Sequence, residues 1–229
     1  MNHSEEETDA CPLGAADCVK LDELVRARDE VNRLEQQVHT DALTGLYNYR
    51  HFSRMMEQEW ERTRRSGQPT ALVMVDLDHF KQVNDRWGHE TGNRVLAHCA
   101  RLMAEMLRKI DIPCRYGGEE FALILPSTSL PRAVSAASRL RVAIEQTPLE
   151  LDGSILGVTA SMGVNVYRRH DALDIDAFIE QTDRYLYRAK QAGRNRVCHP
   201  DFSRFRSETQ VSREEKDALF RPDGATRKR

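Results

Sequence analysis

The chain has 229 residues, which is enough for one sizeable hydrophobic core with appendages. Its formal net charge of −2 gives it no general attraction to nucleic acid, and no apolar run approaches the roughly 18–20 residues of a membrane span. The acidic N-terminus is not followed by the apolar segment of a signal peptide. The five cysteines form no CxxC pair and are an odd number, which fits free thiols in a reducing cytosol. We therefore expect a cytoplasmic protein without a signal peptide, a membrane span or a DNA partner.

Four segments differ in their residue patterns. Residues 1–18 are acidic, lack a hydrophobic repeat and are expected to be mobile. Residues 19–40 predict a helix, because apolar residues recur there at heptad spacing. The repeat consists of Leu24, Ala27, Val31, Leu34 and Val38. It spans little more than two heptads, so it fits either a coiled-coil stalk that joins two chains or an amphipathic helix packed on its own domain. A folded domain is expected over 41–199, followed by a charged tail over 200–229.

Within the folded domain, hydrophobic periodicity separates helices from strands. The segment 90–109 has apolar residues at helical spacing, whereas 71–76 contains the short apolar run of a buried strand. In chain order the pattern predicts helix 49–66, strand 71–76, helix 90–109, strands 112–116 and 120–125, helix 130–146, strands 149–156 and 158–166, helix 174–191 and a last short strand. Because strands and helices do not alternate strictly, we expect an α+β fold rather than a doubly wound parallel sheet.

Two acidic clusters stand at the ends of predicted strands. The first strand ends in Asp76-Leu77-Asp78, and a period of two puts both aspartates on one side if the strand continues. The second cluster, Glu119 and Glu120, follows a pair of glycines, which predicts a hairpin with a tight two-residue turn at positive φ. The carboxylates can converge on Mg²⁺, a cation that prefers oxygen ligands. The alternative is that each acidic residue only solvates the end of a strand.

Six short motifs extend this pattern along the chain. They are DALTGLYN at 41–48, VDLDHFK at 75–81, ND at 84–85, GHETG at 88–92, RYGGEEF at 115–121 and AKQAGRN at 189–195. In this order and spacing they resemble the signatures of the GGDEF domain, the catalytic domain of diguanylate cyclases, from about Asp41 to Cys198. The resemblance implies a ferredoxin-like βααββαβ core, similar to the palm of nucleotide cyclases and polymerases.

The resemblance also implies a reaction. Diguanylate cyclases join two GTP molecules into cyclic di-GMP and release two pyrophosphates, so two domains must meet face to face. By position, Asp76, Glu119 and the carbonyl of Leu77 match the ligands of Mg²⁺, with Mn²⁺ as the alternative metal. Either Glu119 or Glu120 would also help to deprotonate the attacking hydroxyl. The positions that match the phosphate contacts of the family are Lys81, Arg115, Lys190 and Arg194.

Recognition of the base is where the sequence departs from the family pattern. Asn84 matches the asparagine that contacts guanine, but Asn93 stands where the family has an aspartate. A carboxylate accepts from both adjacent guanine donors, whereas an asparagine has one acceptor oxygen and an NH₂ group. The substitution therefore predicts weaker guanine binding or looser discrimination against adenine. Phe80 and His89 lie in the same motifs and are included among the substrate-binding candidates, although His89 fits a structural role equally well.

Regulation is implied by two further features. Arg108 and Asp111 occupy the place of the family's product-inhibition site, where an Arg-x-x-Asp pair binds cyclic di-GMP; the alternative is an ordinary i,i+3 ion pair. Nothing in the chain resembles a phosphoreceiver, PAS or membrane sensor, so we expect control through a homodimer formed by the N-terminal stalk, or through a separate activating protein bound to it. The alternative function is a catalytically weak domain that acts as a receptor for cyclic di-GMP or GTP.

Overall fold

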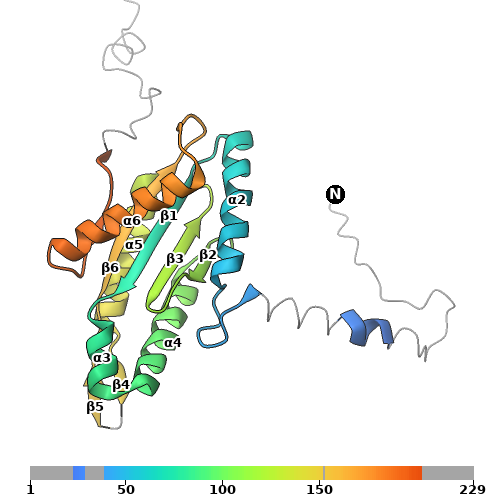
Figure 1. The fold of residues 1–229 in the computed structure, drawn as a ribbon. Helices are drawn as coiled ribbons and strands as arrows, with labels where there is room; N and C mark the ends of the chain where they lie inside the picture. Colours follow the sequence, from blue (N-terminus) through green and yellow to red (C-terminus); the bar gives the residue numbers. More distant parts are fainter. Residues whose placement is uncertain (1–22, 29–38, 152, 203–229) are drawn as a thin grey trace, which may run out of the picture.

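The computed structural model describes residues 23–28, 39–151 and 153–202. A five-stranded sheet in the order β2-β3-β1-β6-β7 forms its centre (Figure 1). The elements in chain order are α2 (Tyr49–Ser66), β1 (Thr70–Leu77), α3 (Phe80–Trp87), α4 (His89–Met106), β2 (Ile112–Arg115), β3 (Glu120–Leu125), α5 (Leu130–Gln146), β4 (Leu149–Leu151), β5 (Ser154–Leu156), β6 (Ala160–Tyr167), α6 (Ile175–Gln191) and β7 (Val197–Cys198). Strand β1 is central and pairs antiparallel with β3 and β6, whereas β7 pairs parallel with β6.

This order confirms the predicted α+β fold. Apart from the β4–β5 hairpin, which is inserted before β6, the elements from β1 onward follow the ferredoxin-like βααββαβ arrangement. No helix in the described part of the chain is long and apolar enough to cross a membrane. Residues 23–28 are helical, as predicted for that part of the stalk. Most of the stalk repeat, the N-terminal residues 1–18 and nearly all of the tail lie outside the described residues, so the predictions about them stay predictions.

Helices cover both faces of the sheet. The side chains of Val73 and Val75 belong to a core that includes buried residues of α3, α4 and α5, whereas Leu72 and Met74 pack with residues of α2 and α6. This alternation follows from the period of two along a strand. Helix α6 lies very close to β6 at Gly163, where a β-carbon would collide with the backbone of the helix. The functional edge is therefore built on a sheet that is buried from both sides.

Two helical regions differ from the prediction. Helix α3 was not predicted, because it has only eight residues and buries only Phe80 and Val83, which is too little for a periodic signal. Helix α4 was predicted to continue to residue 109 but ends at Met106. Its C-cap, Leu107, has extended backbone angles, and the next residues turn to form a hydrogen-bonded loop closed by Asp111. The expected strand 149–156 is a short hairpin, in which Gly153 has a φ of 87°.

The β2–β3 hairpin was predicted correctly, but its turn was not. Residues 117–119 form the tip, and neither Gly117 nor Gly118 has positive φ, so the two-residue turn is wrong. The backbone N–H groups of Tyr116 and Gly117 both donate to the carbonyl of Glu120, at 2.8 and 3.1 Å. Gly117 is needed for space rather than for its φ, because a β-carbon there would lie 2.7 Å from a carboxylate oxygen of Glu120.

Candidate active site

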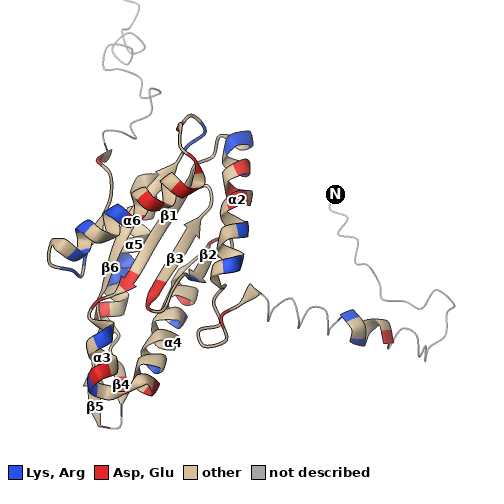
Figure 2. Cartoon of the chain, in the orientation of Figure 1, with Lys and Arg blue, Asp and Glu red and all other residues tan. Residues whose placement is uncertain are grey.

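Three carboxylates meet at one edge of the sheet, and we refer to Asp76, Glu119 and Glu120 as the acidic cluster. Asp76 lies near the end of β1, directly opposite Glu120 in the register of β3. The backbone N–H of Leu77 donates to the carbonyl of Glu119 at 3.3 Å, which places the hairpin tip beside the end of β1. Figure 2 shows the acidic ends of β1 and β3 next to each other. Strand pairing therefore brings together carboxylates that are more than 40 positions apart in the sequence.

The negative charge of the acidic cluster is only partly offset by the positively charged side chains near it. Burial raises the pKa of Asp76, although an ion pair of 2.7 Å with the Lys190 ammonium acts in the opposite direction. Burial, followed by the charge of Asp76, also raises the pKa of Glu119 and of Glu120. All three ionised forms are thus disfavoured by their surroundings. A bound cation would relieve this imbalance.

The donor set at this edge fits a magnesium ion that is bound together with a substrate. Asp76 and Glu119 offer carboxylate oxygens, and Leu77 offers a backbone carbonyl, all of which are ligands for a hard cation. Among the residues that the structure describes, no three His, Cys, Asp or Glu side chains form a ready-made metal site. Mg²⁺ usually takes only one or two protein carboxylates and completes its shell with water and substrate phosphates. The site therefore fits the two-carboxylate arrangement expected from the sequence.

Asp78 does not join this cluster as a ligand. Its carboxylate accepts hydrogen bonds from the hydroxyls of Thr159 and Ser161, both at 2.7 Å, and from the backbone N–H of Asn195 at 3.0 Å. Strand β1 ends at Leu77, so Asp78 already belongs to the turn into α3. The idea that both aspartates of the motif serve one cation is therefore corrected: Asp78 ties β6 and the loop after α6 to the end of β1.

The four predicted phosphate-binding cations have different surroundings. Lys190 lies in the last turn of α6 and contacts Asp76, and the exposed Arg194 is close enough for its charge to lower the pKa of Asp76. Lys81 is exposed in the first turn of α3. The guanidinium of Arg115 instead binds the carboxylate of Asp41 at 3.1 Å and the carbonyl of Gly118 at 2.8 Å. In this structure its guanidinium therefore orders the hairpin tip, and the phosphate assignment of Arg115 stays a prediction.

Asp41 is a residue whose role the motif alone did not reveal. Its carboxylate also accepts from the backbone N–H and the hydroxyl of Thr44, at 2.9 and 2.7 Å. It thereby holds the turn that follows the predicted stalk and ties that turn to Arg115, 74 positions later. The spacing of Asp and Thr three residues apart is a turn signal that was present in the sequence.

The predicted base-binding residues lie on α3 and at the start of α4. The amide of Asn84 rests directly against the backbone of Gly92, where a β-carbon would collide with it, and the buried ring of Phe80 lies beside the same glycine. Asn93 follows Gly92 and is half-buried like Asn84, whereas His89 is exposed at the first turn of α4. The structure thus brings both asparagines to the junction of two helices. Phe80 serves the packing of that junction.

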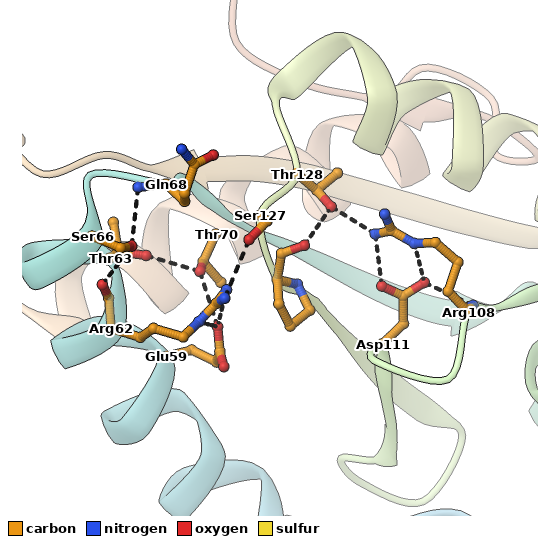
Figure 3. A network of polar contacts seen from close by, with 11 residues as sticks. Glu59, Arg62, Thr63, Ser66, Gln68, Thr70, Arg108, Asp111, Ser127 and Thr128 are labelled. Atoms are coloured by element: carbon orange, nitrogen blue, oxygen red, sulfur yellow. Dashed lines mark hydrogen bonds and ion pairs between the residues drawn. The ribbon is translucent and has the colours of Figure 1, made fainter. Parts of the chain in front are cut away.

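Arg108 and Asp111 form a bidentate ion pair just before β2, at the end of the β2–β3 hairpin opposite its tip. The guanidinium donates to both carboxylate oxygens, at 2.8 and 3.1 Å, and to the hydroxyl of Thr128 at 2.7 Å (Figure 3). The side chain of Asp111 is 4% exposed and that of Arg108 is 52% exposed. The ion-pair alternative is therefore present in the structure. However, a pocket of about 420 Å³ adjoins the pair and is also lined by Arg132 and Arg139, so its wall is strongly basic.

The class that the fold and site define is a ferredoxin-like α+β domain in which the acidic cluster lies beside Lys190 and Arg194 at one edge of the sheet. The family model described as "Diguanylate cyclase, GGDEF domain" matches residues 38–196. The chain is 41% identical over 162 residues to the diguanylate cyclase DgcP of Pseudomonas aeruginosa, covering 71% of this chain and 24% of that protein. It is 38% identical over 160 residues to the response regulator PleD of Caulobacter vibrioides, covering 69% and 35%. The chain belongs to the GGDEF family.

Solved structures of related proteins have the same fold. The coiled coil and GGDEF domain of DgcB from Caulobacter crescentus, in complex with c-di-GMP, superimposes with a TM-score of 0.73 at 27% identity, covering 79% of this chain and 95% of that one. The diguanylate cyclase SiaD of Pseudomonas aeruginosa, in complex with its activator SiaC, gives a TM-score of 0.69 at 36% identity, covering 79% and 72%. The chain spans about a quarter to a third of the length of the curated relatives DgcP and PleD.

Proposed function

We propose that this chain is a diguanylate cyclase that condenses two GTP molecules into cyclic di-GMP and two pyrophosphates. The observation that supports this most strongly is the acidic cluster, in which three carboxylates with raised pKa values share the single ammonium of Lys190. Such an imbalance suits a site that receives a cation together with polyphosphate. The names of the related cyclases agree with this reaction.

In the proposed reaction each domain binds one GTP, and the 3′-hydroxyl of each nucleotide attacks the α-phosphate of the other. A new ester bond forms between the 3′-oxygen and the α-phosphorus. The bond between the α-phosphorus and the oxygen that bridges to the β-phosphorus breaks, and pyrophosphate leaves. Asp76, Glu119 and the Leu77 carbonyl would hold Mg²⁺, or alternatively Mn²⁺, which offsets the charge of the phosphates when bound. Glu120 remains to accept the hydroxyl proton, and burial, followed by the charge of Asp76, raises its pKa, which makes it a stronger base.

Lys190, Arg194 and Lys81 would hold the phosphates of the substrate. Lys190 contacts Asp76 at 2.7 Å, so its ammonium is already next to the carboxylate that would bind the metal. Fixed cations near a reacting phosphate stabilise charge that moves in the transition state, without needing to reorganise. Because this chemistry needs little covalent help, position and charge are the main contributions of the protein.

Asn84 and Asn93 would recognise the base. The oxygen of Asn93 can accept from guanine N1–H, but its NH₂ group then faces the 2-amino group or solvent. This mismatch supports a second candidate function, a cyclase with relaxed base specificity. It also keeps open a catalytically weak domain that acts as a receptor of GTP or cyclic di-GMP.

Two further features would regulate the enzyme. The basic pocket beside Arg108 and Asp111 would bind the product and slow the enzyme, and the DgcB structure shows a related domain in complex with c-di-GMP. The N-terminal stalk would bring two domains together, alone or with a separate activator, and SiaD is an example of a related cyclase in complex with an activator. The ion pair of Asp41 with Arg115 offers a direct connection from the end of the stalk to the hairpin that carries Glu119.

One assay tests the proposed function. Purified protein is incubated with Mg²⁺ and GTP, ATP or both, and the products are separated by chromatography. We expect cyclic di-GMP from GTP and no product from Asp76→Asn. A mixed or adenine-containing product would support relaxed base specificity. Tight binding of cyclic di-GMP without turnover of GTP would instead support the receptor.

A further inference from the structure

The loop after α6 has an unusual backbone conformation. Two consecutive residues that are not glycine, Arg194 and Asn195, have φ values of 61° and 46°. Asparagine tolerates this left-handed region, whereas a long side chain such as arginine rarely adopts it. Such conformations are strained and persist only where the surroundings enforce them. The contacts that hold residues 192–196 are therefore informative.

Backbone hydrogen bonds fix the loop at two points. The N–H of Arg194 donates to the carbonyl of Ala189 at 3.0 Å, which closes the end of α6. The N–H of Asn195 donates to the carboxylate of Asp78 at 3.0 Å, and Asp78 is only 5% exposed. The loop is thus attached to the end of β1, two residues from Asp76.

The side chain of Asn195 is held by a third set of contacts from helix α5. Arg141 donates to its oxygen at 2.7 Å, and its NH₂ group donates to Glu145 at 2.7 Å. Arg141 and Glu145 also form an ion pair with each other at 2.8 Å. Each of the three side chains contacts the other two, and we refer to them as the α5 clamp. The hydrogen bonds from Arg141 and then Asn195 lower the pKa of Glu145.

We propose that the α5 clamp is a positioning device that holds the loop 192–196 so that Lys190 and Arg194 face the triphosphate of the substrate. The inference rests on the proposed function, because it assigns the loop a triphosphate. Lys190 is the last-but-one residue of α6 and contacts Asp76, and Arg194 begins the left-handed pair that the clamp fixes. Arg141, Glu145 and Asn195 do not touch the substrate in this proposal; they act through the loop.

The sharpest test removes the side-chain contacts of the clamp but keeps a residue that tolerates positive φ at position 195. Asn195→Gly keeps the N–H that binds Asp78 and accepts positive φ without strain, but it loses both side-chain contacts. Arg141→Met breaks the clamp from the side of α5 and leaves the loop sequence intact. The matched control is Arg101→Met, which breaks an i,i+4 ion pair of the same length, 2.8 Å to Glu105 on α4, and whose other contact is with His98 on the same helix rather than with the loop 192–196.

The affinities for two different nucleotides distinguish a positioning role of the clamp from a general loosening of the domain. Calorimetry in Mg²⁺ compares GMP with a GTP analogue that has a methylene bridge between its α- and β-phosphorus atoms. We expect both clamp variants to bind the analogue about tenfold more weakly, as for loss of one charged hydrogen bond, and GMP with unchanged affinity. Arg101→Met should match the wild-type protein for both ligands.

Three results would overturn the proposal. The first is an equal loss for the analogue and GMP, which would indicate general loosening of the domain. The second is unchanged binding of the analogue in Arg141→Met, a result that counts even if Asn195→Gly does not fold. The third is a wild-type protein that binds the analogue no more tightly than GMP. A wild-type protein that prefers the analogue, and loses this preference in the clamp variants, supports the proposal even if it forms no cyclic di-GMP; only the proposed function would then fail.

Discussion

Replacing Glu119 with glutamine should lower activity and raise stability at the same time. Glu119 lies at the hairpin tip beside Asp76 and Glu120, and its pKa is raised first by burial and then by the charge of Asp76. A raised pKa in the folded state means that the ionised carboxylate destabilises the fold at neutral pH. Glutamine keeps the size and shape of the side chain but removes this charge. It also removes a charged ligand that the proposed metal site needs.

The size of both effects follows from the geometry. Like charges on neighbouring strands, such as the directly opposed Asp76 and Glu120, destabilise a sheet by about 0.2–1 kcal/mol. Removing one charge of the cluster should stabilise the metal-free protein by a similar amount, which for a domain of this size raises Tm by roughly 0.4–4 °C. Loss of a preorganised charge at the reacting phosphates costs about 2.7–4 kcal/mol, so turnover should fall roughly 10²–10³-fold.

Thermal unfolding in EDTA at pH 7 and cyclic di-GMP formation in Mg²⁺ measure the two effects. The gain in Tm should disappear as the pH falls below the ordinary Glu value of 4.5, because Glu119 is then protonated in both the folded and the unfolded wild-type protein. Glu105→Gln is the control, since Glu105 is 56% exposed on α4 and, within the described part of the chain, pairs only with Arg101. It should change neither quantity appreciably. A lower Tm for Glu119→Gln in EDTA, or turnover within a few-fold of wild type, would refute the reasoning.

Four further predictions address regulation, specificity and pH. Arg108→Ala should raise accumulated product but not the initial rate, because an inhibitory site acts only when it is occupied; a wild-type enzyme that is insensitive to added cyclic di-GMP would contradict this. Asn93→Asp should tighten GTP binding or sharpen the preference for GTP over ATP by about 1–3 kcal/mol, and competition binding with equal results for both forms would show that residue 93 does not touch the base. Truncation of residues 1–38 should leave a folded, largely monomeric domain with low, concentration-dependent activity, and full activity at low concentration would remove the stalk from the mechanism. Burial, and then nearby positive charge, lowers the pKa of His51, so the unfolded state binds more protons and the stability should fall as the pH drops below the ordinary value of 6.5. His51→Gln should flatten that part of the stability curve, and equal slopes in chemical denaturation would count against this explanation.

The sequence predicted the elements that carry a strong periodic or continuous apolar signal. Strand β1 is buried on both faces, and α6 buries a regular stripe, so both were found within one or two residues. Helix α3 was missed because its two buried residues give no period, although it carries Lys81 and Asn84. The β4–β5 hairpin was read as one strand despite the Asp-Gly pair at 152–153, which is a hairpin signal. The short elements near the predicted substrate residues were therefore the hardest to predict.

The site was predicted in its residue types but not in its contacts. Resemblance to a family supplied the positions of Asp76 and Glu119, and strand pairing then placed them together. The partners of Arg115 and Asn195 lie 74 and 50 positions away, at Asp41 and Glu145. A pattern along the chain contains no information about such pairs, because they depend on how the elements pack. This is why neither the Asp41–Arg115 ion pair nor the α5 clamp was foreseen.

The number of hydrogen-bond and ion-pair partners distinguishes the charged side chains that support the fold of this domain from those available for chemistry. Asp78 and Arg115 belong to the same motifs as Asp76 and Glu119, but both have polar partners within the domain. The carboxylate of Asp78 accepts three hydrogen bonds. The guanidinium of Arg115 donates to the carboxylate of Asp41 and to the carbonyl of Gly118. Such hydrogen bonds and ion pairs hold the backbone of the domain in place. The acidic cluster is different, since its carboxylates share one lysine and burial disfavours each ionised form. Binding of the proposed cation and polyphosphate would therefore lower its free energy. This difference, rather than the presence of acidic residues as such, makes the edge of β1 and β3 the place where chemistry is expected.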